Sequence, residues 1–308
     1  MKQPIRIGTR DSELAMWQAK TVSQALEKLG YQTQLVPVKS QGDIILDKPL
    51  YEFGITGIFT KTLDLAMLND TIDIAVHSMK DVPTALPQGI IEGAVLNRAR
   101  PQDFLLHKGT DFMNDPSSKA VIATGSLRRR AQWLHRFPNH ELVSLRGNLN
   151  TRLEKLKQSS WNGAIFAAAG LERLNLTPSS YLSLDWMVPA PAQGAMLVVV
   201  KEKDTYCQEA VKNLNDPSSA TCVAIERAFL RKLEGGCTAP IGALAQISGD
   251  NVQFHGALFS VDGQRKLEVR KTIPIEEAEG AGVRFAQEIL SSGGGELMQE
   301  IKAAIDKQ

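Results

Sequence analysis

The stretch IRIGTRDSELAMWQA, residues 5–19, passes from a strand pattern into a helix pattern within a few residues. Residues 5–8 are typical of a strand, and Asp11 or Ser12 can cap a helix whose apolar residues recur at helical spacing. A strand at 34–38, a helix at about 58–68 and a strand at 73–76 continue the alternation. Strands that alternate with helices favour a parallel sheet, so we expect an α/β fold.

The same alternation is repeated further along the chain. Strands are predicted at 104–107, 120–124, 141–145 and 163–167, with helices at 126–137, 148–158 and 169–174. The apolar run at 195–200 predicts a strand that is buried on both faces if its sheet is parallel. The last third instead predicts a helix at 218–233, three strands between 241 and 273, and two helices separated by Gly293–Gly295. This order is typical of a small α+β domain.

Three domains are therefore expected. The first is an α/β domain of residues 1–97 with a return strand at 195–213, and the second is an α/β domain of residues 98–194. The third, residues 214–308, is the α+β domain.

Composition narrows the class of function. The 308 residues include 35 Lys and Arg against 34 Asp and Glu, which argues against a general nucleic-acid or membrane-surface binder. The three cysteines form no CxxC pair and lie apart from the five histidines, so no metal site is predicted. No secretory signal and no run of about 20 apolar residues is found. We expect a cytoplasmic protein with neither a nucleic-acid nor a membrane partner.

Polar residues follow the strand at 73–76 in the motif HSMKDVP, residues 77–83. Ligands of open α/β sheets bind beyond the carboxyl ends of strands, where Lys80 and Asp81 lie. Lys80 offers a cation, and Asp81 can hold or donate a proton. The alternative is a solvated salt bridge within a loop.

Three strand-to-helix junctions carry arginines. The residues concerned are Arg10 and Ser12; Thr124, Ser126, Arg128 and Arg129; and Arg146, Asn148 and Arg152. Helix N-termini, hydroxyl groups and guanidinium groups together suit carboxylates or phosphates. A single arginine of this kind is usually solvated, but three junctions indicate a cleft that gathers several anionic groups. Neither a P-loop nor a GxGxxG pattern occurs at them, which disfavours a nucleotide.

The cysteines divide into two kinds. Cys207 and Cys222 lie in helical patterns, where a thiol acts as a small apolar group. Cys237 follows Gly235 and Gly236, which end a helix and leave it on a loop. There it could meet a ligand, or it could be tucked under the turn.

These motifs resemble the porphobilinogen deaminase (hydroxymethylbilane synthase) family over nearly the whole chain and in the same order. The similar stretches are IRIGTRDSELAMWQA, QGDIILDKPL, DIAVHSMKDVPTALPQGI, ATGSLRRRAQWL, SLRGNLNTRLEKL, AAAGLERL, PAPAQGAM and ERAFLRKLEGGCTAPIGA. HSMKDVP, GSLRR, LRGN with TR, and LEGGC are together highly specific. The resemblance implies two domains built like the halves of periplasmic binding proteins, with the active cleft between them, and a small third domain.

The resemblance also implies an activity and a cofactor. A dipyrromethane joined to Cys237 by a thioether would prime the transferase reaction, in which four porphobilinogen molecules condense to hydroxymethylbilane with loss of ammonia. Asp81 is the implied acid–base residue. The implied carboxylate ligands are Arg10, Ser12, Lys80, Thr124, Ser126, Arg128, Arg129, Arg146, Asn148 and Arg152. Arg173, Gln193 and Phe59 match further positions along the site. A monomer is the family expectation.

Two departures from the family pattern stand out. Glu52 and Thr56 replace lysines of the loop that the family pattern places over the cleft, so we expect weaker substrate binding or altered loop behaviour. Ala192 stands where similar sequences have glycine, so the backbone freedom beside Gln193 is expected to differ. The alternative function is a non-catalytic protein that binds a small carboxylate in the same two-lobed cleft, and an RNA-binding role is disfavoured by the low aromatic content of 6%.

Overall fold

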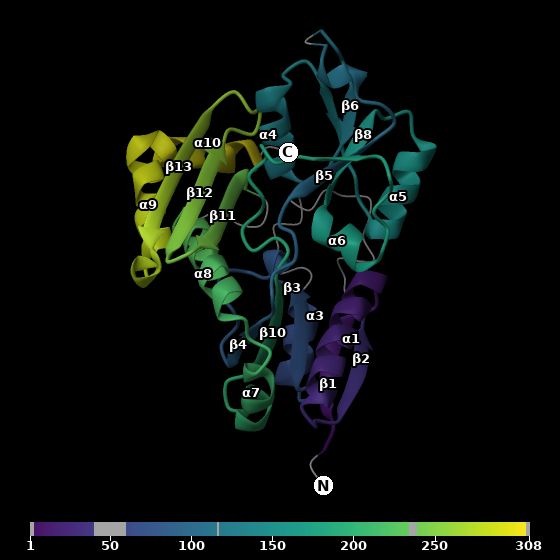
Figure 1. Ribbon diagram of the computed structural model, residues 1–308, viewed down its shortest axis with the longest axis vertical. Helices are drawn as coiled ribbons and strands as arrows, with labels where there is room; N and C mark the ends of the chain where they lie inside the picture. The colour runs from purple at the N-terminus through teal and green to yellow at the C-terminus, as the bar shows by residue number, and fades with distance from the viewer. Residues whose placement is uncertain (1–2, 40–59, 116, 234–238, 306–308) are drawn as a thin grey trace. The chain divides into compact units, whose positions relative to one another are not determined.

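The computed structural model describes residues 3–39, 60–115, 117–233 and 239–305 (Figure 1). These residues divide into two compact units. The first unit contains residues 3–39, 60–99 and 194–221. The second unit contains the described residues of 100–193 and 222–305. No helix in these described ranges is long and apolar enough to cross a membrane.

The first unit is built on a five-stranded sheet in the order β2-β1-β3-β10-β4. Its strands are β1 (Ile5–Arg10), β2 (Thr33–Val38), β3 (Ile74–Ser78), β4 (Ile90–Val95) and β10 (Met196–Lys201). The helices are α1 (Glu13–Lys28), α3 (Lys61–Leu68) and α7 (Thr205–Lys212), with a 3₁₀ turn η2 (Met79–Asp81) after β3. Apolar residues of α1 and α7 share a core with alternate residues of β1 and β3, so these helices cover one face. Leu63 of α3 packs near Gly8 on the other face.

The strand β10 is antiparallel to its neighbours, although its apolar run is typical of a strand in a parallel sheet. The strand is buried from Met196 to Val200, as expected for the apolar run. It pairs antiparallel with both β3 and β4, however, whereas β1 is parallel to β2 and β3. Burial on both faces follows from helices on both sides of the sheet, so an unbroken apolar run does not by itself require a parallel neighbour.

The second unit contains a sheet of the same arrangement, in the order β7-β6-β8-β5-β9. Its strands are β5 (Asp103–His107), β6 (Val121–Ala123), β7 (Glu141–Val143), β8 (Gly163–Ala167) and β9 (Tyr181–Ser183). β6 is parallel to β7 and β8, and β5 is antiparallel to β8 and β9. The core contacts place α4 (Leu127–Arg136) on one face and α5 (Leu149–Gln158) and α6 (Ala168–Arg173) on the other. A 3₁₀ turn, η3 (Asp111–Met113), follows β5.

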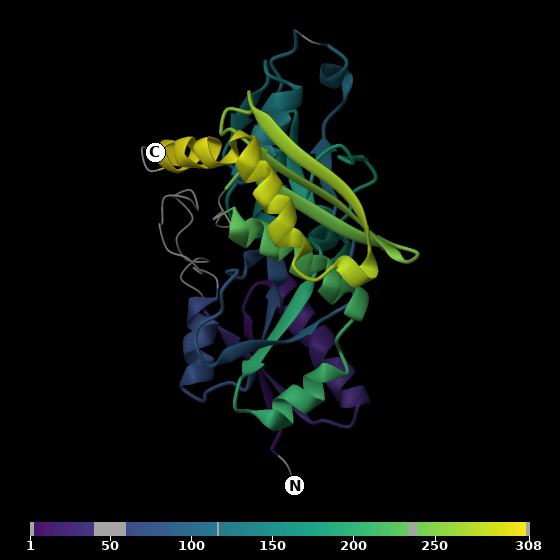
Figure 2. The ribbon, with the colours of Figure 1, turned by 90° about the vertical axis from the view of Figure 1, so that its left-hand side faces the viewer.

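The rest of the second unit is a three-stranded antiparallel sheet covered by helices on one face (Figure 2). The strands are β11 (Ile241–Ser248), β12 (Asn251–Phe259) and β13 (Lys266–Pro274), with a 3₁₀ turn η4 (Ile275–Glu277). The helices are α9 (Ala281–Ile289), α10 (Gly295–Ile305) and α8 (Pro217–Lys232), which belongs to this unit from Cys222 on. The chain kinks between α9 and α10, where Gly293 has φ +95°. The expected glycine break is thus confirmed.

The opposite face of this sheet packs on α4 through a small apolar cluster. Ala131 and Val188 meet Ala257 and Phe259 there. The α/β class with a small C-terminal α+β region is confirmed. The division into three domains stays a prediction, because both sheets of residues 100–305 belong to one compact unit.

Candidate functional site

The first half-site is the set Arg10, Ser12, Lys80 and Asp81, at one edge of the first sheet. β1 and β3 are adjacent and parallel, so their carboxyl ends emerge together. Arg10 ends β1, Ser12 precedes α1, and Lys80 and Asp81 lie in η2 directly after β3. The structure therefore brings these four residues to the same sheet edge, as the strand pattern predicts.

The turn that carries Asp81 is held by its neighbours while the carboxylate itself is left open. The Ser78 hydroxyl accepts a hydrogen bond from Nε2 of Gln18 at 2.9 Å, and the Met79 backbone N–H donates to the Ala195 carbonyl at 3.0 Å. Asp81 has no hydrogen bond or ion pair to any residue that the structure describes. A salt bridge between Lys80 and Asp81 is therefore not formed, and the Asp81 carboxylate can interact with a ligand.

His77 adds a buried basic residue that the motif analysis passed over. It is 6% exposed at the end of β3, and the strand register extended by two residues sets it beside Arg10. Burial and then the positive charge of Arg10 lower the pKa of His77 to about 4. The imidazole is therefore neutral at physiological pH. The only sequence signal was its place at the end of a buried strand.

The second half-site is the set Thr124, Ser126, Arg146, Asn148 and Arg152, at the carboxyl edge of β6 and β7. These two strands are adjacent and parallel. Ser126 caps α4 by accepting from the Arg129 backbone N–H at 3.4 Å, and Asn148 caps α5 by accepting from the Thr151 N–H at 2.9 Å. Each helix thus begins directly at this edge, as predicted from the junction pattern.

Arg146 is the residue of this half-site with the clearest need for an anion. It is 8% exposed and forms no ion pair with any described acidic residue, and its Nε has no hydrogen-bond partner. Burial lowers the pKa of Arg146 from its usual value. A buried cation without a counter-charge is costly, so an anionic ligand would stabilise this arrangement. Arg152 lies nearby, with its Nε donating to the Gly147 carbonyl at 2.6 Å.

Arg128 and Arg129 are buried against Asp103, a residue that the sequence analysis missed. Nη2 of Arg128 and Nη2 of Arg129 each lie 2.7 Å from a different carboxylate oxygen of Asp103, which is fully buried. The remaining donors reach the carbonyls of Val188 and Ile165, and Nε of Arg128 has no partner in the described residues. Both guanidinium groups are thus largely committed to the protein. Their expected binding of ligand carboxylates stays a prediction.

The Asp103 cluster still carries excess positive charge. Burial alone would raise the pKa of Asp103, but Arg128, Arg129 and a hydrogen bond from Gln193 outweigh it and hold the pKa well below its usual range. One carboxylate therefore faces two guanidinium groups, which leaves one positive charge uncompensated. The residues next to Asp103 in the sequence do not indicate this pairing, because Arg128 lies 25 positions further along the chain.

The residues around Gln193 belong to the same buried network. Nε2 of Gln193 donates to the Pro101 carbonyl at 2.7 Å and to Asp103 at 2.8 Å. Ala192 has φ +61°, a left-handed conformation that favours glycine, and its N–H donates to the buried Glu226 at 2.6 Å. The expected difference in backbone freedom at Ala192 thus has a geometric basis.

Arg173 is the last residue of α6, a helix that begins directly after β8. Burial lowers its pKa to about 10.

Cys237, Phe59, Glu52 and Thr56 lie outside the described residues. Cys207 and Cys222 are buried in helices, which confirms their predicted apolar role.

Each half-site thus gathers cations and hydrogen-bond donors where parallel strands end, and the first also presents an open carboxylate. Such a set is typical of an α/β protein with sites for carboxylate-rich ligands at its sheet edges.

Comparison with known proteins makes the class specific. A family model described as "Porphobilinogen deaminase, dipyromethane cofactor binding domain" matches residues 5–209, and one described as "Porphobilinogen deaminase, C-terminal domain" matches residues 220–291. The chain belongs to the porphobilinogen deaminase family, which confirms the resemblance found in its motifs.

Two curated relatives illustrate the match. A porphobilinogen deaminase of Geobacter sulfurreducens is 42% identical over 301 residues, covering 96% of this chain and 94% of the relative. One of Moorella thermoacetica is 42% identical over 307 residues, covering 98% of each. Among solved structures, a probable amino-acid ABC transporter extracellular-binding protein of Bacillus subtilis covers 70% of this chain and 91% of its own, with 13% identity and a TM-score of 0.43.

Proposed function

We propose that this chain is a transferase that condenses four porphobilinogen molecules into the linear tetrapyrrole hydroxymethylbilane, with release of ammonia at each addition. Family membership supports the reaction, and the open carboxylate of Asp81 beside the cations of the first half-site is the observation that carries it. A non-catalytic carboxylate binder would need the arginines but has no use for Asp81.

The residues present suit a dipyrromethane cofactor. Each of its pyrroles carries an acetate and a propionate, so it presents several carboxylates. Arg146, which is buried without an acidic partner in the described ranges, fits one of them, and the hydroxyls of Thr124 and Ser126 add donors at the start of α4. We propose Cys237 as its attachment point. When bound, the cofactor supplies the free pyrrole carbon at which the chain of rings grows.

Asp81 is proposed to manage the proton and the charge of the reacting pyrroles. Its carboxylic acid form assists proton transfer to the departing amine of porphobilinogen, and its carboxylate form stabilises positive charge at a pyrrole nitrogen. Arg10, Ser12 and Lys80 hold the carboxylates of the substrate at the same edge. Arg128, Arg129, Asn148 and Arg152 are proposed to extend this binding along the second sheet, with Arg173, Gln193 and Phe59 along the path.

The mass of the purified chain tests the cofactor and its anchor. We expect a covalent excess equal to two pyrrole units, lost in Cys237→Ser and retained in Cys222→Ser, because Cys222 is buried in α8. An unmodified mass in a chain that consumes porphobilinogen would overturn the attachment.

The kinetics of Asp81→Asn test the acid–base role. We expect kcat to fall by about 10²- to 10⁴-fold, the usual contribution of a general acid, while the two-pyrrole excess stays on the chain. Asp11→Asn, a neighbouring acid, serves as the control. Near-normal turnover in Asp81→Asn refutes the role. The monomeric state and the cytoplasmic location stay predictions.

A further inference from the structure

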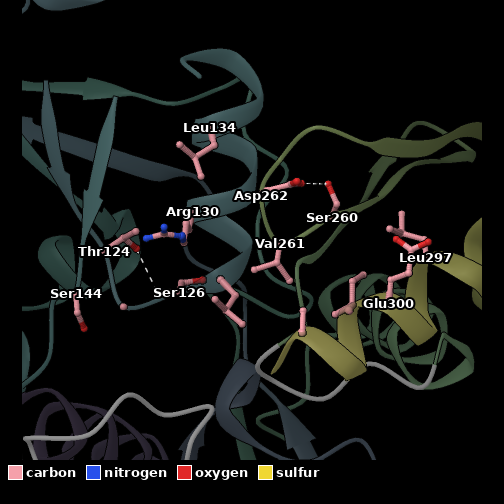
Figure 3. A pocket seen from close by; sticks show the side chains of 14 residues that line it. Thr124, Ser126, Arg130, Leu134, Ser144, Ser260, Val261, Asp262, Leu297 and Glu300 are labelled. Carbon is pink, nitrogen blue, oxygen red and sulfur yellow. Dashed lines mark hydrogen bonds between the residues drawn. The ribbon is translucent and has the colours of Figure 1, made fainter. Parts of the chain in front are cut away.

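A cavity of about 650 Å³ lies within the second unit, among α4, the turn between β12 and β13, and α10 (Figure 3). Leu127, Arg130 and Leu134 share one face of α4 through their spacing of three and four residues, and all three line the cavity. Leu297 and Ile301 of α10 contribute to the facing wall. The lining of the cavity therefore combines polar and apolar side chains in similar measure.

The α4 side of the cavity is suited to a carboxylate. Nη1 of Arg130 donates to the Leu142 carbonyl at 3.0 Å, and Arg130 forms no ion pair in the described part of the chain. Thr124 is 7% exposed and lines the same space. Its hydroxyl oxygen accepts from the Ser126 N–H at 3.2 Å, while its hydroxyl proton meets no acceptor among the described residues. The Arg130 cation is thus left for a ligand, whereas the Thr124 hydroxyl belongs to the second half-site.

The opposite side carries negative charge. The carboxylate of Asp262 accepts from the Ser260 hydroxyl at 2.5 Å and from the Gln264 N–H at 3.0 Å, and these bonds lower its pKa. Asp262 forms no ion pair within the described ranges, whereas Glu300, which also lines the cavity, is paired with Arg265. Asp262 is exposed, and the charge of Arg265 also acts on it without forming a direct ion pair, so an ammonium group could still pair with its carboxylate.

The two walls are joined by direct packing. A Cβ on Gly263 would lie 2.4 Å from the Ala131 carbonyl oxygen and 2.7 Å from the His135 nitrogen, and Gly263 has φ +76°. Its own carbonyl is 2.8 Å from Nδ1 of His135. The turn that carries Asp262 therefore rests on α4, and the placement of Asp262 relative to Arg130 is set by the protein before any ligand arrives.

We propose that this cavity is a second binding site for porphobilinogen, with a carboxylate at Arg130 and the ammonium group at Asp262. The charges point to a small amino acid of this kind, and its identity as porphobilinogen rests on the proposed function. Pyrroles that have reacted have lost the amine and keep only carboxylates, which Asp262 repels. The cavity therefore selects the unreacted substrate over the growing chain, beside the helix start that the second half-site uses.

Calorimetric titration of the full chain tests this site. Asp81→Asn is used as the background so that porphobilinogen is not consumed, and the second probe is the same pyrrole diacid without its aminomethyl group. We expect two classes of site for porphobilinogen. Arg130→Gln weakens the second class at least about tenfold for both probes, the usual effect of a lost charged hydrogen bond. Arg136→Gln, on the same helix and outside the cavity, leaves it unchanged.

The variant Asp262→Asn tests whether Asp262 binds the ammonium group or only stabilises the turn between β12 and β13. The amide oxygen of asparagine keeps both hydrogen bonds of the turn, so we expect weaker binding of porphobilinogen alone, by about tenfold, and unchanged binding of the diacid. A single class of site in the Asp81→Asn background overturns the proposal, as does equal weakening of both probes. A wild-type chain that fails to consume porphobilinogen contradicts the proposed function instead, whatever the titration gives.

Discussion

The two junctions of the second sheet, residues 124–130 and 144–152, share one order of residue types and bury their arginines in opposite ways. At the first junction, Arg128 and Arg129 lie against the carboxylate of Asp103. At the second, Arg146 is nearly as buried but has no acidic partner in the described ranges. The first arrangement completes the protein with its own counter-charge, and the second leaves the counter-charge to a ligand. A run of arginines at a helix start therefore does not tell by itself which of them serve binding.

Removing the counter-charge of the first junction has the largest expected effect. Asp103→Ala leaves two guanidinium groups buried without their carboxylate, so the free energy of unfolding should fall by about 3–5 kcal/mol in urea titration. Asp111→Ala removes an exposed acid of the same unit and serves as the control. A loss no greater than that of the control would mean that Asp103 does not hold the junction.

The contact between the two junctions is tested next. A Cβ on Gly125 would lie 2.6 Å from the Leu145 carbonyl oxygen, so Gly125→Ala must push the junctions apart. We expect a loss of about 1–3 kcal/mol in the free energy of unfolding. Gly295→Ala, where a Cβ meets nothing within 4 Å, should cost nothing. Equal stability of the two variants would show that the junctions adjust freely.

His77 is a third kind of buried basic residue, because it is neutral at physiological pH, whereas the arginines of the two junctions are charged. Its folded pKa of about 4 lies below the unfolded value of 6.5, so its contribution to stability is complete above pH 6.5 and is lost as pH falls toward 4. Between pH 7 and pH 4.5 this loss is about 2 kcal/mol. His77→Phe should therefore lose less stability than wild type over this range, and His107→Phe should match wild type. Parallel pH curves for wild type and His77→Phe would contradict the buried neutral state.

The helix caps distinguish the junctions on a smaller scale. Asn148 accepts from the Thr151 N–H at 2.9 Å and from its hydroxyl at 2.9 Å, whereas Ser126 accepts from Arg129 at 3.4 Å. Asn148→Ala should cost about 1–2 kcal/mol and Ser126→Ala about 0.5 kcal/mol in thermal or urea unfolding. The reverse order would show that cap geometry is not what separates them.

Replacing an arginine by methionine at each junction compares the two directly, and the smallest change in the free energy of unfolding is expected at Arg146. In the cofactor-free Cys237→Ser chain, Arg146→Met removes a buried cation that has no acidic partner among the described residues, so the free energy of unfolding should stay within about 1 kcal/mol of that of the Cys237→Ser parent, or rise. Arg128→Met removes a partner of the buried Asp103 and should be clearly less stable. Equal losses in urea titration would mean that Arg146 has a counter-charge after all.

The sequence predicted what depends on local pattern. Most strands and helices of both sheets, the break at Gly293 and the apolar role of Cys207 follow from periodicity and residue type over short windows. The strands β4 and β9 were not predicted, and the return strand expected at 195–213 is a strand only at 196–201, followed by the helix α7. The direction of β10 depends on partners more than 100 residues away, and the local apolar run does not encode it. Membership of the family came from motifs in order along the chain, which spacing alone would not have supplied.

The candidate site was predicted less completely, for a similar reason. The edge position of Asp81, Thr124 and Arg146 follows from where each strand ends. The direction of a side chain does not, so Arg128 and Arg146 looked equivalent before the pairing with Asp103 was known. Asp103 lies at the start of an apolar strand, where a lone acid gives no signal of the two arginines that it meets in the fold.

The shared topology of the two sheets has a consequence for synthesis on the ribosome. β10 lies between β3 and the edge strand β4, so the first sheet has a gap beside β3 until residues 196–201 have been made. The second sheet is contiguous, from β5 to β9 within residues 103–183, and can close earlier. The first sheet, whose first strands are made earliest, is therefore completed only after the second sheet, and until then its unpaired strand edges need shelter from other chains.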